Sequence, residues 1–196
     1  HNLDWMRALD KSTSYVARAG MIAAAYASLT VISLLFLQGL AWGPIQLRVS
    51  EALTVLAVLT PAAIPGLTIG CLLANLLGIA LTGSGVMGLF DVVFGSLATL
   101  LAALWCHRFK ERPVLALAGP VIANALIVAA YLPIILAAYG FYTIPFTDID
   151  LAGSYPLMYL FGALSISIGE AVVVYGLGYP LMLALRKLPL FQHHED

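Results

Sequence analysis

The stretch ALTVLAVLTPAAIPGLTIGCLLANLLGIALTGSGVMGLF, residues 52–90, contains no Asp, Glu, Lys or Arg. A helix that crosses the hydrocarbon core of a bilayer needs about 20 apolar residues, so this stretch is long enough for one tilted helix or for two helices. Further uncharged stretches occupy residues 19–47, 92–107, 113–147, 151–169 and 171–185. Only 10% of the 196 residues are charged, against about 25% in soluble domains. The sequence therefore predicts an all-α integral membrane protein and excludes a soluble domain, a disordered chain and a self-sufficient nucleic-acid binder.

The basic residues predict how often the chain crosses the bilayer, because loops rich in Lys and Arg stay in the cytoplasm. Eight of the nine lie in three clusters, which are Arg7, Lys11 and Arg18; Arg108, Lys110 and Arg112; and Arg186 and Lys187. The first two clusters share one side only if the chain crosses an even number of times between them, so the stretch 50–82 must cross twice. We expect a bundle of six transmembrane helices with both termini cytoplasmic, at about 19–39, 50–62, 65–82, 88–107, 114–139 and 157–185.

The second span is short by the length rule, so we expect it to be tilted, partly irregular or shielded by its neighbours. An amphipathic cytoplasmic segment at 1–18 is expected to lie along the membrane surface, before the membrane domain at 19–187 and a tail at 188–196. The expected location is the plasma membrane of a prokaryote, with lipid around the bundle.

Several polar residues lie at mid-depth or in the outer half of these spans. Glu170, for example, precedes Arg186 by sixteen residues, or roughly 24 Å at 1.5 Å per residue. A charged group at the bilayer centre costs about 2.5 to 3.5 kcal/mol on insertion scales, so such residues usually face a cavity or a partner. The pattern predicts a polar pocket that opens to the outside, built from Arg48, Glu51, Asn75, Asp91, Asn124 and Glu170.

Each of these residues also has a structural interpretation. Glu51 follows Ser50 at a helix start, where a carboxylate stabilises the helix dipole, or it pairs with Arg48. Asp91 has a similar position at the outer end of its span. The amides of Asn75 and Asn124 are suited to hydrogen bonds between helices.

Two spans carry stripes of small residues. The first has Ala19, Ala23 and Ala27, and the third repeats small residues at Gly66, Gly70, Ala74 and Gly78. Membrane helices associate through such faces, since close packing replaces the hydrophobic drive in lipid. Either both stripes pack within the bundle, or one of them docks another membrane subunit.

The motifs of enzymes are absent from the sequence. GSGVMG at 83–88 has the spacing of a dinucleotide-binding loop but follows a membrane helix rather than a strand. There is no P-loop, no HExxH metal motif and no nucleophile elbow, and Cys71 and Cys106 lie apart in apolar runs. We expect a protein that is not an enzyme and that holds no metal or cofactor of its own.

Five segments of the chain resemble the QueT family, whose members are predicted queuosine-precursor transporters. The segments are GPIQLRVSEALTVL (43–56), AIPGLTIGCLLANLLG (63–78), DVVFGSLATLLAA (91–103), IANALIV (122–128) and SISIGEAVVVYGLGYPL (165–181). The resemblance implies a six-helix S component, the substrate-binding subunit of an energy-coupling factor (ECF) transporter, which captures queuine or a prequeuosine deazaguanine base outside the cell. It further implies a transmembrane coupling protein, the T component, and two cytoplasmic ATPases that use ATP. An AxxxA pattern in the first helix would dock the T component, and Ala19, Ala23 and Ala27 supply it.

The polar residues suit such a ligand. A guanine-like edge presents a ring N–H and an amino group side by side, which one carboxylate accepts in a bidentate manner, while an amide donates to the carbonyl. Glu170 with Asn75 or Asn124 is the expected pair. Asp91 or Glu51 is placed to balance a cationic aminomethyl substituent. Trp42 and Tyr131 are candidates to stack on the base, which contributes about 1 to 3 kcal/mol.

Three other functions fit the same sequence. One is an S component for another small heterocycle or vitamin. Another is an ATP-independent carrier in which Glu170 or Asp91 carries protons. The third is a membrane-structural protein that binds no small molecule.

Overall fold

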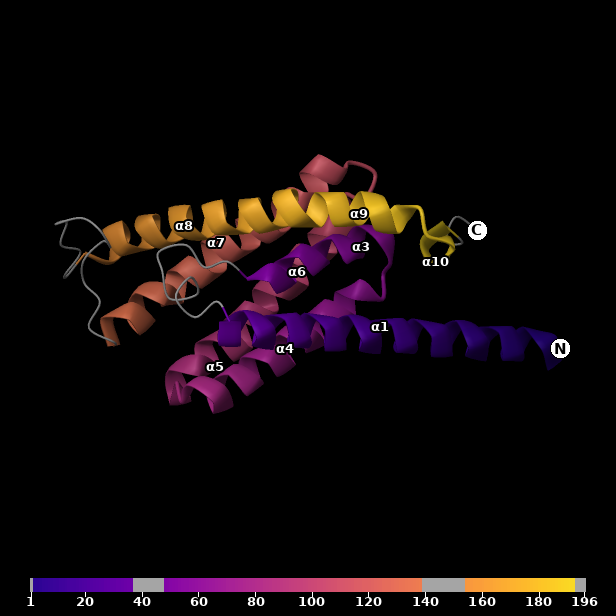
Figure 1. The fold of residues 1–196 in the computed structure, drawn as a ribbon, viewed down its shortest axis with the longest axis horizontal. Helices are drawn as coiled ribbons and strands as arrows, with labels where there is room; N and C mark the ends of the chain where they lie inside the picture. Colours follow the sequence, from indigo (N-terminus) through magenta and orange to yellow (C-terminus); the bar gives the residue numbers. More distant parts are fainter. Residues whose placement is uncertain (1, 37–47, 139–153, 193–196) are drawn as a thin grey trace.

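The computed structural model describes residues 2–36, 48–138 and 154–192 (Figure 1). All regular structure within these ranges is helical, as the composition predicted. The elements, in chain order, are α1 (Asn2–Phe36), η1 (Val49–Val55), α3 (Leu56–Leu59), α4 (Ala63–Thr82), η2 (Gly85–Met87), α5 (Gly88–Phe90), η3 (Asp91–Gly95), α6 (Ser96–Arg108), α7 (Pro113–Ala138), α8 (Tyr155–Ala171), η4 (Val172–Gly178), α9 (Tyr179–Arg186) and α10 (Pro189–Gln192). Of the η elements, η1 and η2 are 3₁₀-helices, and η3 and η4 are π-helical.

Five of the described helices are long and apolar enough to cross a membrane. They are Leu3–Phe36, Ala63–Thr82, Gly85–Arg108, Pro113–Ile135 and Tyr155–Arg186, and each contains or closely matches one of the predicted spans. The predicted second span corresponds to the shorter apolar helix Val49–Leu59. The expected six-helix count therefore holds only if this short helix is included.

The short helix has the irregular and shielded character that its length predicted. Its seven-residue 3₁₀ part and four-residue α-helical part together span about 20 Å, less than a bilayer core of about 30 Å. It is largely buried, and it contacts α1, α4, α6, α7, η4 and α9. The surrounding helices thus shield its polar backbone from lipid.

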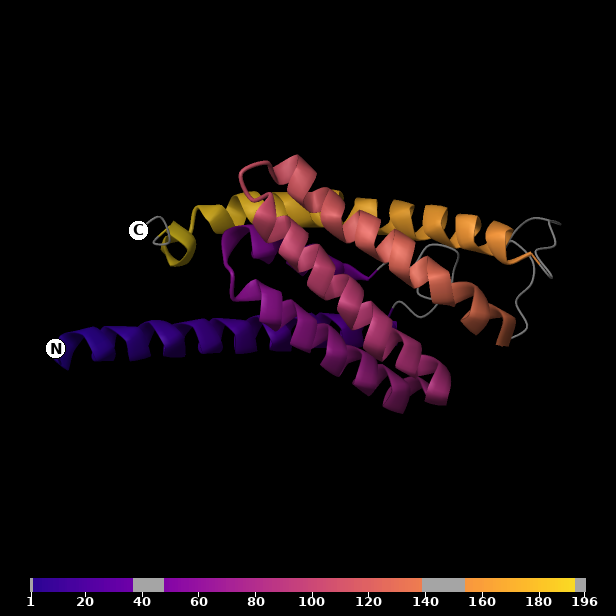
Figure 2. The same cartoon turned by 180° about the vertical axis from the view of Figure 1, so that it is seen from behind.

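The longer helices pack one after another beside this central element. In the order α1, α4, α6, α7 and α8, each contacts the next, and Figures 1 and 2 show the short purple segment between α1 and the yellow helix α9. The start of α1, the end of α10 and the turn between α6 and α7 lie at the same end of the bundle in both views. The segment 2–18 continues the first span in one unbroken helix, α1, rather than turning away from it as expected for a surface segment.

The two small-residue stripes pack against each other. A Cβ atom added at Gly66 would lie 2.8 Å from the carbonyl oxygen of Ala19, and one added at Gly70 would lie 2.8 Å from that of Ala23. Ala23 is buried, and Ala27 packs on the same core. This face of α1 is thus used at least in part within the bundle, and the docking of a partner by Ala19, Ala23 and Ala27 stays a prediction.

Candidate functional site: a buried polar cluster

Six of the predicted polar residues, together with Tyr131, converge on one cluster inside the bundle. Glu51 comes from the central helix η1 with Arg48 just before it, Asn75 comes from α4, and Asp91 opens η3. Asn124 and Tyr131 lie on α7, and Glu170 lies on the last turn of α8. Electrostatic interactions connect Arg48 with Glu51, Asp91 and Glu170, so these groups form a single charged site.

Both π-helical elements adjoin carboxylates of the cluster. Asp91 is the first residue of η3, and η4 begins two residues after Glu170. A π-helical turn inserts extra residues into an α-helix and changes the direction of its side chains, and such turns are frequent at functional sites. The close approach of η4 to the central helix requires Gly178, where a Cβ atom would lie 2.7 Å from Cγ1 of Val55.

One half of the cluster is held by internal hydrogen bonds. Nη2 of Arg48 donates to Oδ1 of Asn75 at 2.8 Å, and Nδ2 of Asn75 donates to the backbone carbonyl of Asp91 at 2.7 Å. The hydroxyl of Tyr131 donates to Oδ1 of Asp91 at 2.6 Å. Its ring stacks on Phe90, with centroids 5.8 Å apart. We call Arg48, Asn75, Asp91 and Tyr131 the bracing half, because their bonds connect η1, α4, η3 and α7.

The other half consists of Glu51, Asn124 and Glu170, and we call it the open half. Glu51 is 1% exposed and Glu170 is 7% exposed, yet Oε2 of each has no hydrogen-bond partner among the described residues. Oε1 of Glu51 accepts a hydrogen bond from the hydroxyl of Tyr26. Leaving a buried acceptor unpaired costs about 1 to 3 kcal/mol, and more for a charged group. The open half therefore has acceptor capacity that the described protein groups do not use.

Asn124 lies beside both of these carboxyl groups. Its Nδ2 also donates to the carbonyl of Pro120, one turn earlier on α7, at 3.0 Å. The sequence left open whether Asn75 or Asn124 is the partner of Glu170. The structure favours Asn124, since both ends of the Asn75 amide are bonded within the bracing half.

The sequence also predicted Trp42 and Tyr131 as residues that stack on the base. Trp42 lies outside the described residues. Tyr131 is close to the cluster, but it bonds Asp91 and packs on Phe90 and Phe94, so its ring and hydroxyl serve the protein's own packing. Its role in base stacking stays a prediction.

Several buried polar residues of the interior were not among the predicted site residues. Tyr26 bonds Glu51, and Thr30 bonds Ser50 at 2.7 Å, which connects α1 to the start of the central helix. Ser96 is buried, and its Oγ has no partner among the described residues. Tyr26 was recognisable as the one ring in the small-residue run AAAYAS (23–28), whereas single hydroxyls are too common in membrane helices to identify a site.

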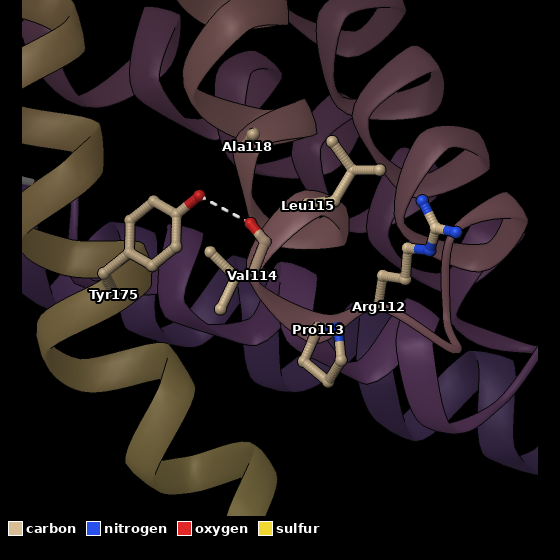
Figure 3. A pocket seen from close by; sticks show the side chains of 6 residues that line it. All are labelled: Arg112, Pro113, Val114, Leu115, Ala118 and Tyr175. Carbon is tan, nitrogen blue, oxygen red and sulfur yellow. Dashed lines mark hydrogen bonds between the residues drawn. The ribbon is translucent and has the colours of Figure 1, made fainter.

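A separate groove of about 570 Å³ lies at the start of α7 (Figure 3). It is lined by Arg112, Pro113, Val114, Leu115, Ala118 and Tyr175. The hydroxyl of Tyr175 crosses from η4 and donates to the carbonyl of Val114 at 2.8 Å. The groove contains no residue of the polar cluster, and its mainly apolar lining offers little to bind a polar base.

These features define a polytopic α-helical membrane protein with a charged cluster enclosed by its helices. The family model of the QueT transporter matches residues 16–187, and the chain belongs to this family. The queuosine precursor transporter QueT of Lactococcus lactis subsp. cremoris is 38% identical over 104 residues, which cover 53% of this chain and 58% of that protein. The chain thus aligns with a little over half the length of this relative. No solved structure matches the chain.

The comparisons confirm the resemblance noted in the sequence. Together with the five apolar helices, they identify a multi-pass protein of a prokaryotic plasma membrane.

Proposed function

We propose that the protein is the substrate-binding subunit of an importer and that it captures a queuosine precursor, queuine or a prequeuosine deazaguanine base. The observation that carries this proposal is the open half of the cluster, where two buried carboxyl groups keep unpaired acceptor atoms. A deazaguanine base presents several N–H donors on one edge, so its chemistry complements that of the site. The Lactococcus lactis relative is a queuosine precursor transporter, which agrees with this class of ligand.

In this proposal Glu170 forms hydrogen bonds with the edge of the base. Its carboxylate accepts the ring N–H and one hydrogen of the exocyclic amino group, and Asn124 supplies an amide donor for the carbonyl. Hydrogen bonds to a charged group contribute about 1.5 to 3 kcal/mol in a buried site. Binding thereby satisfies an acceptor whose burial is otherwise costly.

A titration of the detergent-purified protein with a deazaguanine base tests this function. Glu170→Gln replaces an acceptor oxygen with a donor, so we expect a loss of about 1.5 to 3 kcal/mol, or roughly tenfold to more than a hundredfold in affinity. Glu111→Gln is the matched control, because Glu111 is exposed in the turn between α6 and α7. Near-native affinity in a folded Glu170→Gln protein would remove Glu170 from the site.

We further propose that the chain is an S component that works with a T component and two cytoplasmic ATPases. The sequence has no P-loop, so ATP would be hydrolysed by partner subunits. On α1, the face left for a partner is Gly20, Ala24 and Ser28, which are all exposed and repeat at four-residue spacing. Uptake of labelled base by cells should then stop when ATP is depleted and persist when a protonophore is added at constant ATP. The opposite result would favour a proton-coupled carrier.

A further inference from the structure

The two carboxylates of the open half differ in how they are held. Tyr26, which is completely buried on α1, donates its hydroxyl hydrogen to Oε1 of Glu51. This bond fixes one oxygen of Glu51 and leaves Oε2 as its unpaired acceptor. No hydrogen bond from α1 reaches Glu170 in the part of the chain that the structure describes, and the groups that interact with Glu170 in the site are Glu51, Arg48 and Asn124. Glu51 is therefore a single, oriented acceptor.

Glu51 and Glu170 also lie close together. Each interacts with the same amide of Asn124, and they interact electrostatically with each other. The bracing half keeps its own donors engaged, because Arg48 bonds Asn75 and Tyr131 bonds Asp91. Two adjacent acceptors that both remain unpaired are complementary to one group with two hydrogens.

The exocyclic amino group of a guanine-like base is such a group. One of its hydrogens lies beside the ring N–H, and the other points away from it. A single carboxylate reaches the ring N–H and the first hydrogen but not the second. A second acceptor is needed to bond the amino group fully.

We propose that Glu51 is a specificity-determining residue that accepts the second hydrogen of the ligand's exocyclic amino group, while Glu170 accepts the first hydrogen and the ring N–H. This inference rests on the proposed function and adds a substrate requirement to it. The site would select bases that carry the amino group and reject those that carry only the ring N–H and the carbonyl. A base that lacks the amino group should bind weakly, because it leaves buried acceptors of the site unpaired.

The experiment compares two probes, deazaguanine and deazahypoxanthine, which differ only in the exocyclic amino group. Calorimetric titrations use the wild type, Glu51→Gln and Glu170→Gln. The wild type should bind deazaguanine roughly a hundredfold more tightly than deazahypoxanthine, or more. In Glu51→Gln, with Tyr26 still donating to the remaining oxygen, an amide NH₂ faces the ligand. Its affinity for deazaguanine should fall roughly tenfold or more, and its affinity for deazahypoxanthine should change less than about threefold.

Glu170→Gln provides the contrast, because the ring N–H is present in both probes. This variant should weaken the binding of both. Equal effects of Glu51→Gln on the two probes, or no effect on either, would overturn the inference and leave the proposed function intact. A wild type that binds neither probe would overturn the proposed function and this inference with it.

A third ligand keeps the inference testable if Glu51→Gln does not fold, which thermal melting will show. Deazaguanine with one methyl on the exocyclic amino group retains one N–H and lacks the other. The wild type should bind it roughly tenfold or more weakly than deazaguanine. Equal affinity for the methylated and unmethylated bases would exclude a second acceptor at this group.

Discussion

The contact between α1 and α4 gives a stability prediction that can be worked from the structure. In Gly70→Ala the added Cβ atom would lie 2.8 Å from the carbonyl oxygen of Ala23 and 2.9 Å from Cβ of Tyr26, whereas ordinary contact begins at 3.4 Å. The deficit of about 0.6 Å involves a backbone carbonyl, which cannot rotate aside as a side chain does. The two helices must therefore separate, and overpacking of this kind typically costs about 1 to 3 kcal/mol.

Gly20→Ala is the matched control on α1, because Gly20 is exposed and a Cβ atom there would have nothing within 4 Å. Both variants gain the same preference of Ala over Gly for a helix, about 0.5 to 1 kcal/mol, so their difference isolates the steric cost. For a chain of this size, 1 kcal/mol corresponds to about 2 to 4 °C in melting temperature. We expect Gly70→Ala to melt about 2 to 12 °C below Gly20→Ala.

The assay follows from the two native cysteines. Cys71 and Cys106 are both buried and free, so a thiol-reactive fluorophore reports their exposure as the detergent-solubilised protein unfolds. Equal melting temperatures for Gly70→Ala and Gly20→Ala would refute the close contact of α1 with α4. Because Tyr26 also donates to Glu51, separation of these helices should reduce ligand affinity in Gly70→Ala as well.

Three other predictions test the topology, the partner face and the bracing half. Single cysteines introduced at Ser84 and Glu111 should be labelled from opposite sides of the membrane by an impermeant reagent, and labelling from one side would contradict the crossing between them. Ala24→Leu should leave the melting temperature and ligand binding of the isolated chain unchanged but block association with a T component; unimpaired assembly would exclude this face. Asn75→Leu removes the acceptor of Arg48, so we expect a loss of about 1 to 3 kcal/mol in thermal melts, and wild-type melting would show that the bracing bonds are unimportant.

The sequence predicted the class of protein, the short central helix and most of the cluster for one physical reason. Polar groups are rare in membrane spans, so the few that occur are informative about both depth and site. Glu51, Asn75, Asp91, Asn124 and Glu170 were identified in this way, and they do lie together. Some helix limits also followed from charge, since α6 ends at Arg108, α7 begins directly after Arg112 and α9 ends at Arg186.

The sequence did not determine which side of each helix faces its neighbours. Ala23 and Ala24 are adjacent and chemically identical, yet one is buried against Gly70 and the other is exposed. Only the position of α4 distinguishes them, and that position depends on packing between segments far apart in the chain.

The same limit applies to the two candidate amides. Asn75 and Asn124 have the same side chain and similar burial, so neither type nor depth separates a bracing residue from a binding one. The difference arises because η3 begins at Asp91 and brings its backbone carbonyl to Asn75, while Gly95 leaves room for that amide at 3.3 Å from where a Cβ atom would lie. A π-helical turn has no simple sequence signature, yet here it satisfies the amide of Asn75, whereas Asn124 lies beside the two carboxylates. Assigning a role to a buried polar residue in this family thus requires an account of which of its hydrogen bonds the protein itself already makes.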